Sequence, residues 1–362
     1  ADLIFLGGGI EGSNDRSAYA IFVEAAKNVS NRLELRGALR AENLDKDSTI
    51  NPKVSMRFEA NDNLVLRGSV STSFREPSLS QLNNSSVSLQ GIQDFDTSGN
   101  PVGQASFIRI AQALSKDLTP EESTNLNFGA VWTPSDNLSV KFDYWSIDYK
   151  DVISIESAQG KVIANPNGPD ILRLTDGTLI GVTSKYKNES EVNTDGYDIE
   201  ASYRIDSSIG LINLGINRAH MLSYEIPATG GGMKDVLGLF NHDNFARSLP
   251  ETKTVLSASL INGAHTVGAF YRMISDYETT NVPNSMAVGL GLGQKIDEFN
   301  VLDLRYSYTF DMEDSSIRFS LGVKNATDEE VPTFYDTANF SYDTRQHDPR
   351  GRMVFIGLKY SR

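Results

Sequence analysis

The chain has no cysteine among its 362 residues. Disulfide scaffolds, thiolate metal sites and cysteine nucleophiles are therefore excluded. It also lacks any run of about 18 apolar residues, which a helical membrane span requires. Positive charge is scarce as well, because 33 Lys and Arg residues stand against 47 Asp and Glu, for a net charge of −14. Since nucleic-acid phosphates demand a basic surface, we expect no nucleic-acid partner.

Residue patterns that perform catalysis or hold a cofactor are also missing. The four histidines share no metal-site spacing and lie at His220, His242, His265 and His347. The glycine triplets Gly7–Gly9 and Gly230–Gly232 are not followed by the Lys-Ser/Thr pair of a phosphate loop. The acidic turn Asp311–Asp314 lacks the spacing of an EF-hand. We therefore predict no catalytic site, no resident metal and no cofactor.

What dominates the sequence is a strict alternation of apolar and polar residues. From Leu302 to Phe310, Leu, Tyr and Phe occupy every second position, and charged or hydroxyl residues occupy the positions between them. A two-residue period is typical of β-strands whose two faces meet different surroundings. Such runs predict thirteen strands, at 17–27, 32–43, 51–60, 64–75, 121–133, 138–153, 192–205, 210–226, 252–261, 265–277, 299–310, 316–325 and 350–361.

The connections between these strands alternate between short and long. Short turns rich in Asn, Asp, Gly and Ser are predicted at Asn28–Asn31, Asn61–Asn63, Pro134–Asn137, Asp206–Ser208, Asn262–Gly263 and Asp311–Ser315. Longer loops are predicted at 44–50, 76–120, 154–191, 227–251, 278–298 and 326–349. A soluble β-sandwich has no reason to place all its short turns at one end, whereas a bacterial outer-membrane barrel does. We therefore predict an all-β fold, an antiparallel transmembrane β-barrel with short periplasmic turns and long extracellular loops.

Several segments resemble motifs of one family, and they occur in the family's order along nearly the whole chain. They are Asn51–Arg57 (NPKVSMR), Leu66–Leu82 (LRGSVSTSFREPSLSQL), Asn193–Arg204 (NTDGYDIEASYR), Ser248–Glu251 (SLPE), Leu321–Asp328 (LGVKNATD) and Asp348–Arg352 (DPRGR). On these segments the chain resembles the TonB-dependent outer-membrane receptors.

The resemblance implies a barrel of 22 strands around a plugged lumen. Residues 1–362 would then form the C-terminal portion of that barrel, about thirteen of its strands, without the plug domain and the early strands. No signal peptide precedes the first strand, so we expect the chain to be a fragment. The family usually ends on an aromatic residue, whereas this chain ends Tyr360-Ser361-Arg362.

The resemblance also implies a function without bond chemistry. The receptor would bind a scarce nutrient at its extracellular loops, and the TonB complex, acting through the plug, would supply the energy for import. The expected partners are outer-membrane lipid and lipopolysaccharide of a Gram-negative bacterium, the TonB complex, and a small ligand such as a chelator, oligosaccharide, vitamin or peptide. The alternatives are a passive porin or structural barrel, and a soluble all-β carbohydrate-binding protein.

Candidate contacts follow from where aromatic and charged residues fall in this arrangement. Ligand contacts are expected among aromatic and basic residues of the long loops, which are Arg75, Tyr186, Phe240, Phe245, Tyr277, Tyr335, Tyr342 and Arg345. Arg350 and Arg352, at the outer rim of the last strand, are hypothesised to contact lipopolysaccharide phosphates. Charged residues on the polar strand faces are expected to point into the lumen and to form ion pairs there. They are Arg32, Glu34, Arg36, Arg57, Glu59, Asp198, Glu200, Arg204, Asp303 and Arg305.

Overall fold

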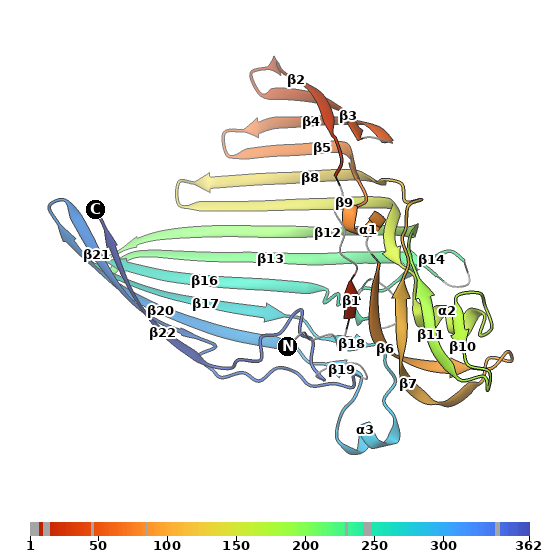
Figure 1. The fold of residues 1–362 in the computed structure, drawn as a ribbon. Coiled ribbons are helices and arrows are strands. Elements are labelled where there is room, and N and C mark those ends of the chain that lie inside the picture. The colour runs from red at the N-terminus through yellow and green to blue at the C-terminus, as the bar shows by residue number, and fades with distance from the viewer. Residues whose placement is uncertain are drawn as a thin grey trace.

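The computed structural model describes residues 7–9, 15–44, 47–83, 85–228, 231–241, 246, 248–336 and 341–362. In this part of the chain, an antiparallel sheet of 14 strands forms a curved wall (Figure 1). Its order is β2-β3-β4-β5-β8-β9-β12-β13-β16-β17-β20-β21-β22, and β14 pairs beside β13. The all-β antiparallel barrel prediction is therefore confirmed. The wall is open, because β2 and β22 each pair with a neighbour on one side only.

The wall strands follow the predicted ranges closely. They are β2 (Tyr19–Ser30), β3 (Leu33–Leu44), β4 (Asp47–Asn61), β5 (Leu64–Arg75), β8 (Glu121–Ser135), β9 (Leu138–Ile155), β12 (Tyr186–Ser207), β13 (Gly210–Pro227), β16 (Thr252–Asn262), β17 (His265–Ile274), β20 (Phe299–Met312), β21 (Ser315–Lys324) and β22 (Met353–Ser361), with the short β14 (Met233–Asp235). None of the helices in the described part of the chain has the length and apolarity needed to cross a membrane.

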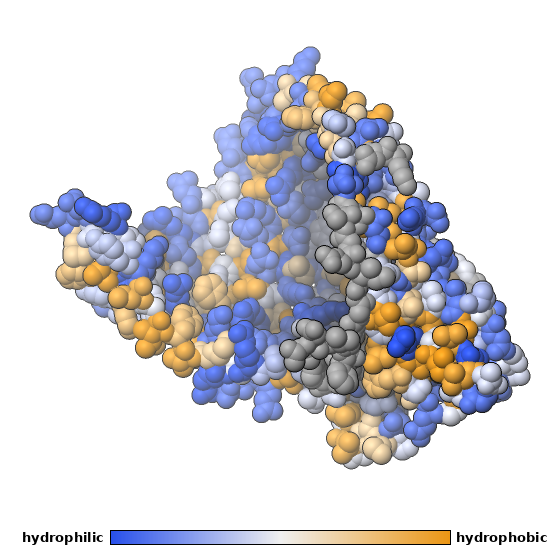
Figure 2. Space-filling view, in the orientation of Figure 1, coloured by the Kyte–Doolittle hydropathy of each residue, from blue (hydrophilic) through white to orange (hydrophobic). Residues whose placement is uncertain are grey.

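The two faces of the wall differ as the alternation predicts. On β22, Ile356 is 71% exposed and Leu358 is 76% exposed, and both pair with apolar partners on β21. Such exposure of large apolar side chains suits a surface that meets lipid rather than water. In Figure 2 the hollow of the wall is largely hydrophilic. Hydrophobic residues form a band along its outer edge, over β20, β21 and β22. The wall therefore has an apolar outside and a polar inside.

The predicted alternation of short and long connections fails at one place. The loop expected at 44–50 is absent as a long loop, because β3 continues to Leu44, β4 begins at Asp47, and these two residues pair. The polar residues Asp47, Ser48 and Thr49 break the apolar alternation although they are part of a strand. Outside the membrane, both faces of a strand meet water, so the two-residue period disappears there. The same reason explains why β12 begins at Tyr186 rather than at residue 192.

At the loop end of the wall, two long loops and a short strand from the N-terminal segment combine into one folded unit, which we call the outer module. Its strands are β1 (Gly7–Gly9), β6 (Ser86–Phe95), β7 (Pro101–Gln112), β10 (Ile171–Arg173) and β11 (Leu179–Ser184), and its helix is α2 (Ala158–Ala164), with α1 (Leu79–Asn83) preceding β6. The sheet order is β1-β6-β7-β11-β10, and β11 runs parallel to β7.

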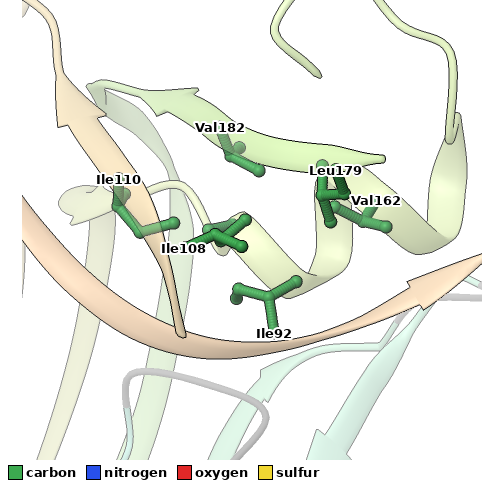
Figure 3. Packing of buried hydrophobic residues seen from close by; sticks show 7 residues of the cluster. Ile92, Ile108, Ile110, Val162, Leu179 and Val182 are labelled. Atoms are coloured by element: carbon green, nitrogen blue, oxygen red, sulfur yellow. The ribbon is translucent and has the colours of Figure 1, made fainter. Parts of the chain in front are cut away.

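The outer module has its own hydrophobic core, which lies between α2 and the sheet (Figure 3). Its buried members are Ile92, Ile108, Ile110, Ala158, Val162, Leu179 and Val182. On the rim of this core, Arg173 of β10 forms a bidentate pair with Asp94 of β6, at 2.6 and 2.7 Å. The module is therefore packed and fastened like a small domain.

A second, smaller unit lies on the later strands and is called here the C-terminal module. It contains β15 (Leu239–Phe240), β18 (Tyr277–Thr279) and β19 (Lys295–Ile296), with α3 (Ser285–Gly289) between β18 and β19. Its buried cluster contains Phe240, Tyr277, Ile296 and Phe334. Figure 1 shows both modules at the same end of the wall, opposite the short turns.

Candidate functional site

The candidate site is the loop end of the wall, and the residues proposed to contact a ligand there fall into two groups. Arg75 and Tyr186 lie at the base of the outer module. Around the C-terminal module and the segment that follows it lie Phe240, Tyr277, Tyr335, Tyr342 and Arg345. Phe245 lies outside the described residues.

Arg75 ends β5 and forms a bidentate pair with Glu121, the first residue of β8. Glu121 is fully buried at 0% exposure, and its carboxylate also accepts hydrogen bonds from the Ile153 N–H at 2.6 Å and the Tyr149 hydroxyl at 3.3 Å. A buried carboxylate is tolerated only when it is paired and hydrogen-bonded. Arg75 therefore joins β5, β8 and β9, and we call this cluster the Glu121 clasp.

Tyr186 begins β12 and pairs with Ile155 of β9. Its backbone N–H donates to the Ser115 hydroxyl at 2.8 Å, and its side chain is partly buried. The backbone of Tyr186 thus fastens the segment after β7 to the wall. Its ring remains partly accessible at the base of the outer module.

Two of the five residues of the second group are buried. Phe240 is 7% exposed and packs edge-on against Phe334, with ring centroids 5.3 Å apart. Tyr277 is 4% exposed, and its hydroxyl donates to Asp343 Oδ2 at 2.6 Å. Burial and this hydrogen bond raise the pKa of the Tyr277 phenol, so it remains a neutral donor. Both side chains hold the C-terminal module together.

The other members of the second group are more accessible. Arg345 is exposed, and its backbone N–H donates to Asp343 Oδ1 at 2.9 Å. Tyr335 and Tyr342 are partly buried, and the Tyr335 hydroxyl accepts a hydrogen bond from the Asn284 side chain at 3.4 Å. The backbone of Arg345 is thus fastened by Asp343 and the ring of Tyr335 by Asn284, and ligand contact by these three residues stays a prediction.

His347 is a feature of this module that residue spacing in the sequence did not reveal. Its ring is 4% exposed, and the ring centroid lies 5.0 Å from that of Phe299 and 6.1 Å from that of Tyr277. Among the described residues, neither ring nitrogen has a hydrogen-bond partner. Burial lowers the pKa of His347, against an opposing contribution from Asp343. His347 is therefore neutral in the folded module.

We expect acid to loosen the C-terminal module through His347. An unfolded histidine titrates near pH 6.5, so the module has its full stability above that pH and loses stability as the pH falls towards the lowered pKa. Hydrogen exchange of residues 341–352 at pH 7.5 and pH 5.5 measures this loss. His347→Phe keeps the ring packing, and its exchange rates, corrected for the intrinsic pH dependence of amide exchange, should show the same protection at both pH values. An equal pH response in the two proteins would contradict the assignment.

The polar inner face of the wall carries paired charges. Five pairs join residues on the same strand, on neighbouring strands or across one intervening strand: Arg36–Glu34 at 2.5 Å, Arg57–Glu59 at 2.5 Å, Arg67–Asp143 at 2.5 Å, Lys141–Glu200 at 3.0 Å and Arg272–Asp303 at 2.8 Å. A recess of about 410 Å³ lies among the cationic side chains of β3, β4 and β5. This face therefore carries charges of both signs, and many of them are paired.

One of these pairs explains a glycine. Arg67 of β5 reaches Asp143 of β9 across the intervening strand β8, where Gly129 pairs with both residues in register. A Cβ atom at Gly129 would lie 2.1 Å from Asp143 Oδ1. Only glycine therefore leaves room for an ion pair that links next-nearest strands.

Arg350 and Arg352 lie before β22, and each has a carboxylate partner. Arg350 Nη2 lies 2.6 Å from Asp348 Oδ2, and this guanidinium lowers the pKa of Asp348 to about 2. Arg352 Nη2 lies 3.8 Å from Asp328 Oδ2. Both arginines are exposed, so a lipid phosphate would compete with these carboxylates. Within the described ranges, no three His, Asp or Glu side chains are placed to hold a metal ion.

The curved wall with its polar inner face, the outer module and the C-terminal module together resemble a known architecture. The family described as "TonB dependent receptor-like, beta-barrel" matches residues 5–326. The chain belongs to this family. No curated protein sequence matches this TonB-dependent receptor barrel closely enough to be counted as a relative.

Solved structures share the fold of this TonB-dependent receptor barrel. A ferric enterobactin receptor (PfeA) variant from Pseudomonas aeruginosa, in complex with enterobactin, has a TM-score of 0.66 at 15% identity over 96% of this chain and 45% of its own. The siderophore receptor PirA from Acinetobacter baumannii has a TM-score of 0.64 at 16% identity, over 96% of this chain and 46% of its own. The FrpB iron transporter from Neisseria meningitidis has a TM-score of 0.57 at 13% identity, over 96% of this chain and 45% of its own. The chain thus spans less than half the length of these receptors.

Proposed function

We propose that the chain forms the C-terminal part of the barrel of an outer-membrane receptor that binds a scarce nutrient at its loop end and imports it with energy supplied through TonB. The observation that carries the proposal is the family match over residues 5–326. The open wall supports it, since its unpaired edges at β2 and β22 call for further strands.

The ligand we propose is an iron-chelate complex. Several structures with this fold are named as receptors of iron chelators or as an iron transporter. In the C-terminal module, Tyr335 and Tyr342 provide rings for stacking, and Arg345 provides an exposed guanidinium. We assign these three side chains to ligand contact, with Arg75 and Tyr186 holding the base of the outer module. We propose no enzymatic activity.

The test uses the receptor in the form in which the cell makes it, in the outer membrane of cells grown without iron. Radiolabelled ferric complexes of a catecholate chelator and a hydroxamate chelator are the probes, with cobalamin and a maltooligosaccharide as competing ligand classes. We expect one ferric complex to bind and enter the cell, and a protonophore to stop entry without stopping binding.

Arg345→Ala should weaken binding of that complex about tenfold, because it removes a charge-assisted contact. Arg350→Ala is the matched control, since its guanidinium lies in the same segment but is already paired with Asp348. Entry that continues in the presence of the protonophore would indicate a passive porin instead.

A further inference from the structure

One arginine faces outward from the membrane-spanning part of the wall. Arg218 of β13 pairs in register with Ile199 of β12 and Thr254 of β16. Residues that pair in register share a face, and Ile199 belongs to the apolar, lipid-facing set of β12. Arg218 therefore lies on the outside of the barrel, whereas most charged residues of the wall described above lie on the inside.

Arg218 has no partner in the part of the chain that the structure describes. It forms no hydrogen bond or ion pair with any residue that the structure describes, and its Nε atom is buried without a partner. This distinguishes it from Arg350 and Arg352, each of which has a carboxylate partner. An unpaired charge on a lipid-facing surface is costly, and such residues usually mark a binding function.

The position of Arg218 along β13 places it near the outer edge of the membrane. It follows Gly210, the first residue of β13, by eight positions. At about 3.3 Å per residue and a tilt of about 40°, it lies roughly 20 Å above the short-turn end, within an apolar band about 25 Å tall. A long arginine side chain at this height extends towards the headgroups of the outer leaflet.

The next outward row, two residues further along the strands, supports this height. It contains Phe128, Tyr144, Tyr197 and His220 in register. Tyrosine rings collect at the boundary between lipid and water. The guanidinium of Arg218 thus lies just below the aromatic girdle, where lipid phosphates are found.

Polar groups above Arg218 suit a sugar. His220 Nδ1 lies 2.6 Å from the Thr252 hydroxyl, and its ring lies 5.0 Å from that of Tyr197. Further out on the same face, Asp195 accepts hydrogen bonds from the Tyr144 hydroxyl at 3.0 Å and from the Ser223 hydroxyl at 2.5 Å. Both oxygens of Asp195 therefore already accept a hydrogen bond, and this face offers hydroxyl, imidazole and carboxylate groups to sugar hydroxyls.

We propose that Arg218 binds a phosphate of a phosphorylated glycolipid in the outer leaflet, and that the row containing Tyr197 and His220 meets its sugar. The phosphate supplies the missing partner of the guanidinium through charge-assisted hydrogen bonds. The sugar distinguishes this lipid from a phospholipid, which has no sugar ring to place against the polar row. The proposal rests on the transmembrane orientation of the wall and not on the identity of the imported nutrient.

The experiment measures lipid binding to the purified receptor by native mass spectrometry, with defined lipids added in detergent. The probes are bisphosphorylated lipid A, the same lipid A after removal of both phosphates, and phosphatidylglycerol. Wild-type protein should bind bisphosphorylated lipid A at least about tenfold more tightly than either of the others. Arg218→Met, which retains the apolar stem, should lose that preference. Nutrient uptake is not used in this readout, so failure of the uptake proposal would not affect it.

Lys27→Met is the matched control, because Lys27 is also in register with the outward face, opposite Leu35, but lies near the short-turn end. It should bind all three lipids as the wild type does. Two results would overturn the proposal: equal binding of lipid A with and without phosphates by the wild type, or equal binding of phosphatidylglycerol and bisphosphorylated lipid A. The first comparison needs no variant, so it remains decisive if Arg218→Met fails to assemble.

Discussion

Val162→Asp is expected to unfold the outer module while the barrel wall stays intact. Val162 of α2 is fully buried, at 0% exposure, in the core that joins α2 to β6, β7 and β11. An aspartate there has no polar partner, and burying it costs about 4 kcal/mol or more. The free energy of unfolding of a module with one small core is not large enough to offset a destabilisation of that size. The strands and helix of the outer module should therefore lose their packing, while the separate core of the C-terminal module is untouched.

The measurement compares protease cleavage within residues 86–112 and 158–184 on intact cells with heat-modifiable migration of the barrel. Cleavage should become rapid, whereas the migration of the folded barrel should not change. Ile163→Asp is the control, because Ile163 is the next residue of the same helix and is 53% exposed. It should leave cleavage and ligand binding as in the wild type. If both variants behave alike, the core of α2 does not hold the module together.

Arg75→Met should destabilise the junction of β5, β8 and β9. It removes the cation from the Glu121 clasp and leaves a fully buried carboxylate with two remaining donors, Ile153 N–H and the Tyr149 hydroxyl. Removing one partner of a buried ion pair costs about 3 kcal/mol. Hydrogen exchange of the first residues of β8 and the last residues of β9 should accelerate by about a hundredfold, since each 1.4 kcal/mol is a factor of ten.

A double variant tests whether the cause is electrostatic. Arg75→Met combined with Glu121→Met removes both charges and leaves two apolar side chains of similar length, a change that is often neutral for buried pairs. Exchange at the ends of β8 and β9 should return close to the wild-type rate. If the double variant exchanges as fast as Arg75→Met, the lost stability comes from packing of the arginine stem, and the charge pair of the Glu121 clasp contributes little.

The wall could be predicted from the sequence because lipid and water impose different side chains on its two faces. From Leu302 to Phe310 the alternation is complete, and the structure places these residues in β20 with the expected register. Where a strand leaves the membrane this constraint ends, so the ends of β4 and β12 were misjudged. Turn residues such as Asn262 and Gly263 mark the short connections, because their local backbone preferences are sufficient to form a tight turn.

The outer module and the C-terminal module could not be predicted by the same reasoning. The pairing of β7 with β11 is parallel and joins residues about seventy positions apart in the sequence, such as Arg109 and Gly181. No local sequence pattern can therefore predict it. Residue type did not reveal burial either. The sequence places Phe240 and Tyr277 in loops, where aromatic residues suit ligand contact, but in the structure they belong to the core of the C-terminal module. Ligand contact by Tyr335, Tyr342 and Arg345 stays a prediction.

The parallel pairing of β7 and β11 has a consequence for how such receptors can be altered. The two strands come from different loops, so residues 76–120 and 154–191 make halves of one sheet. A chimera that receives only one of these loops from another receptor would have strand edges without partners and half a core. Recombination between related genes is thus expected to preserve the two loops as a pair, and grafting of new binding specificity should transfer both together.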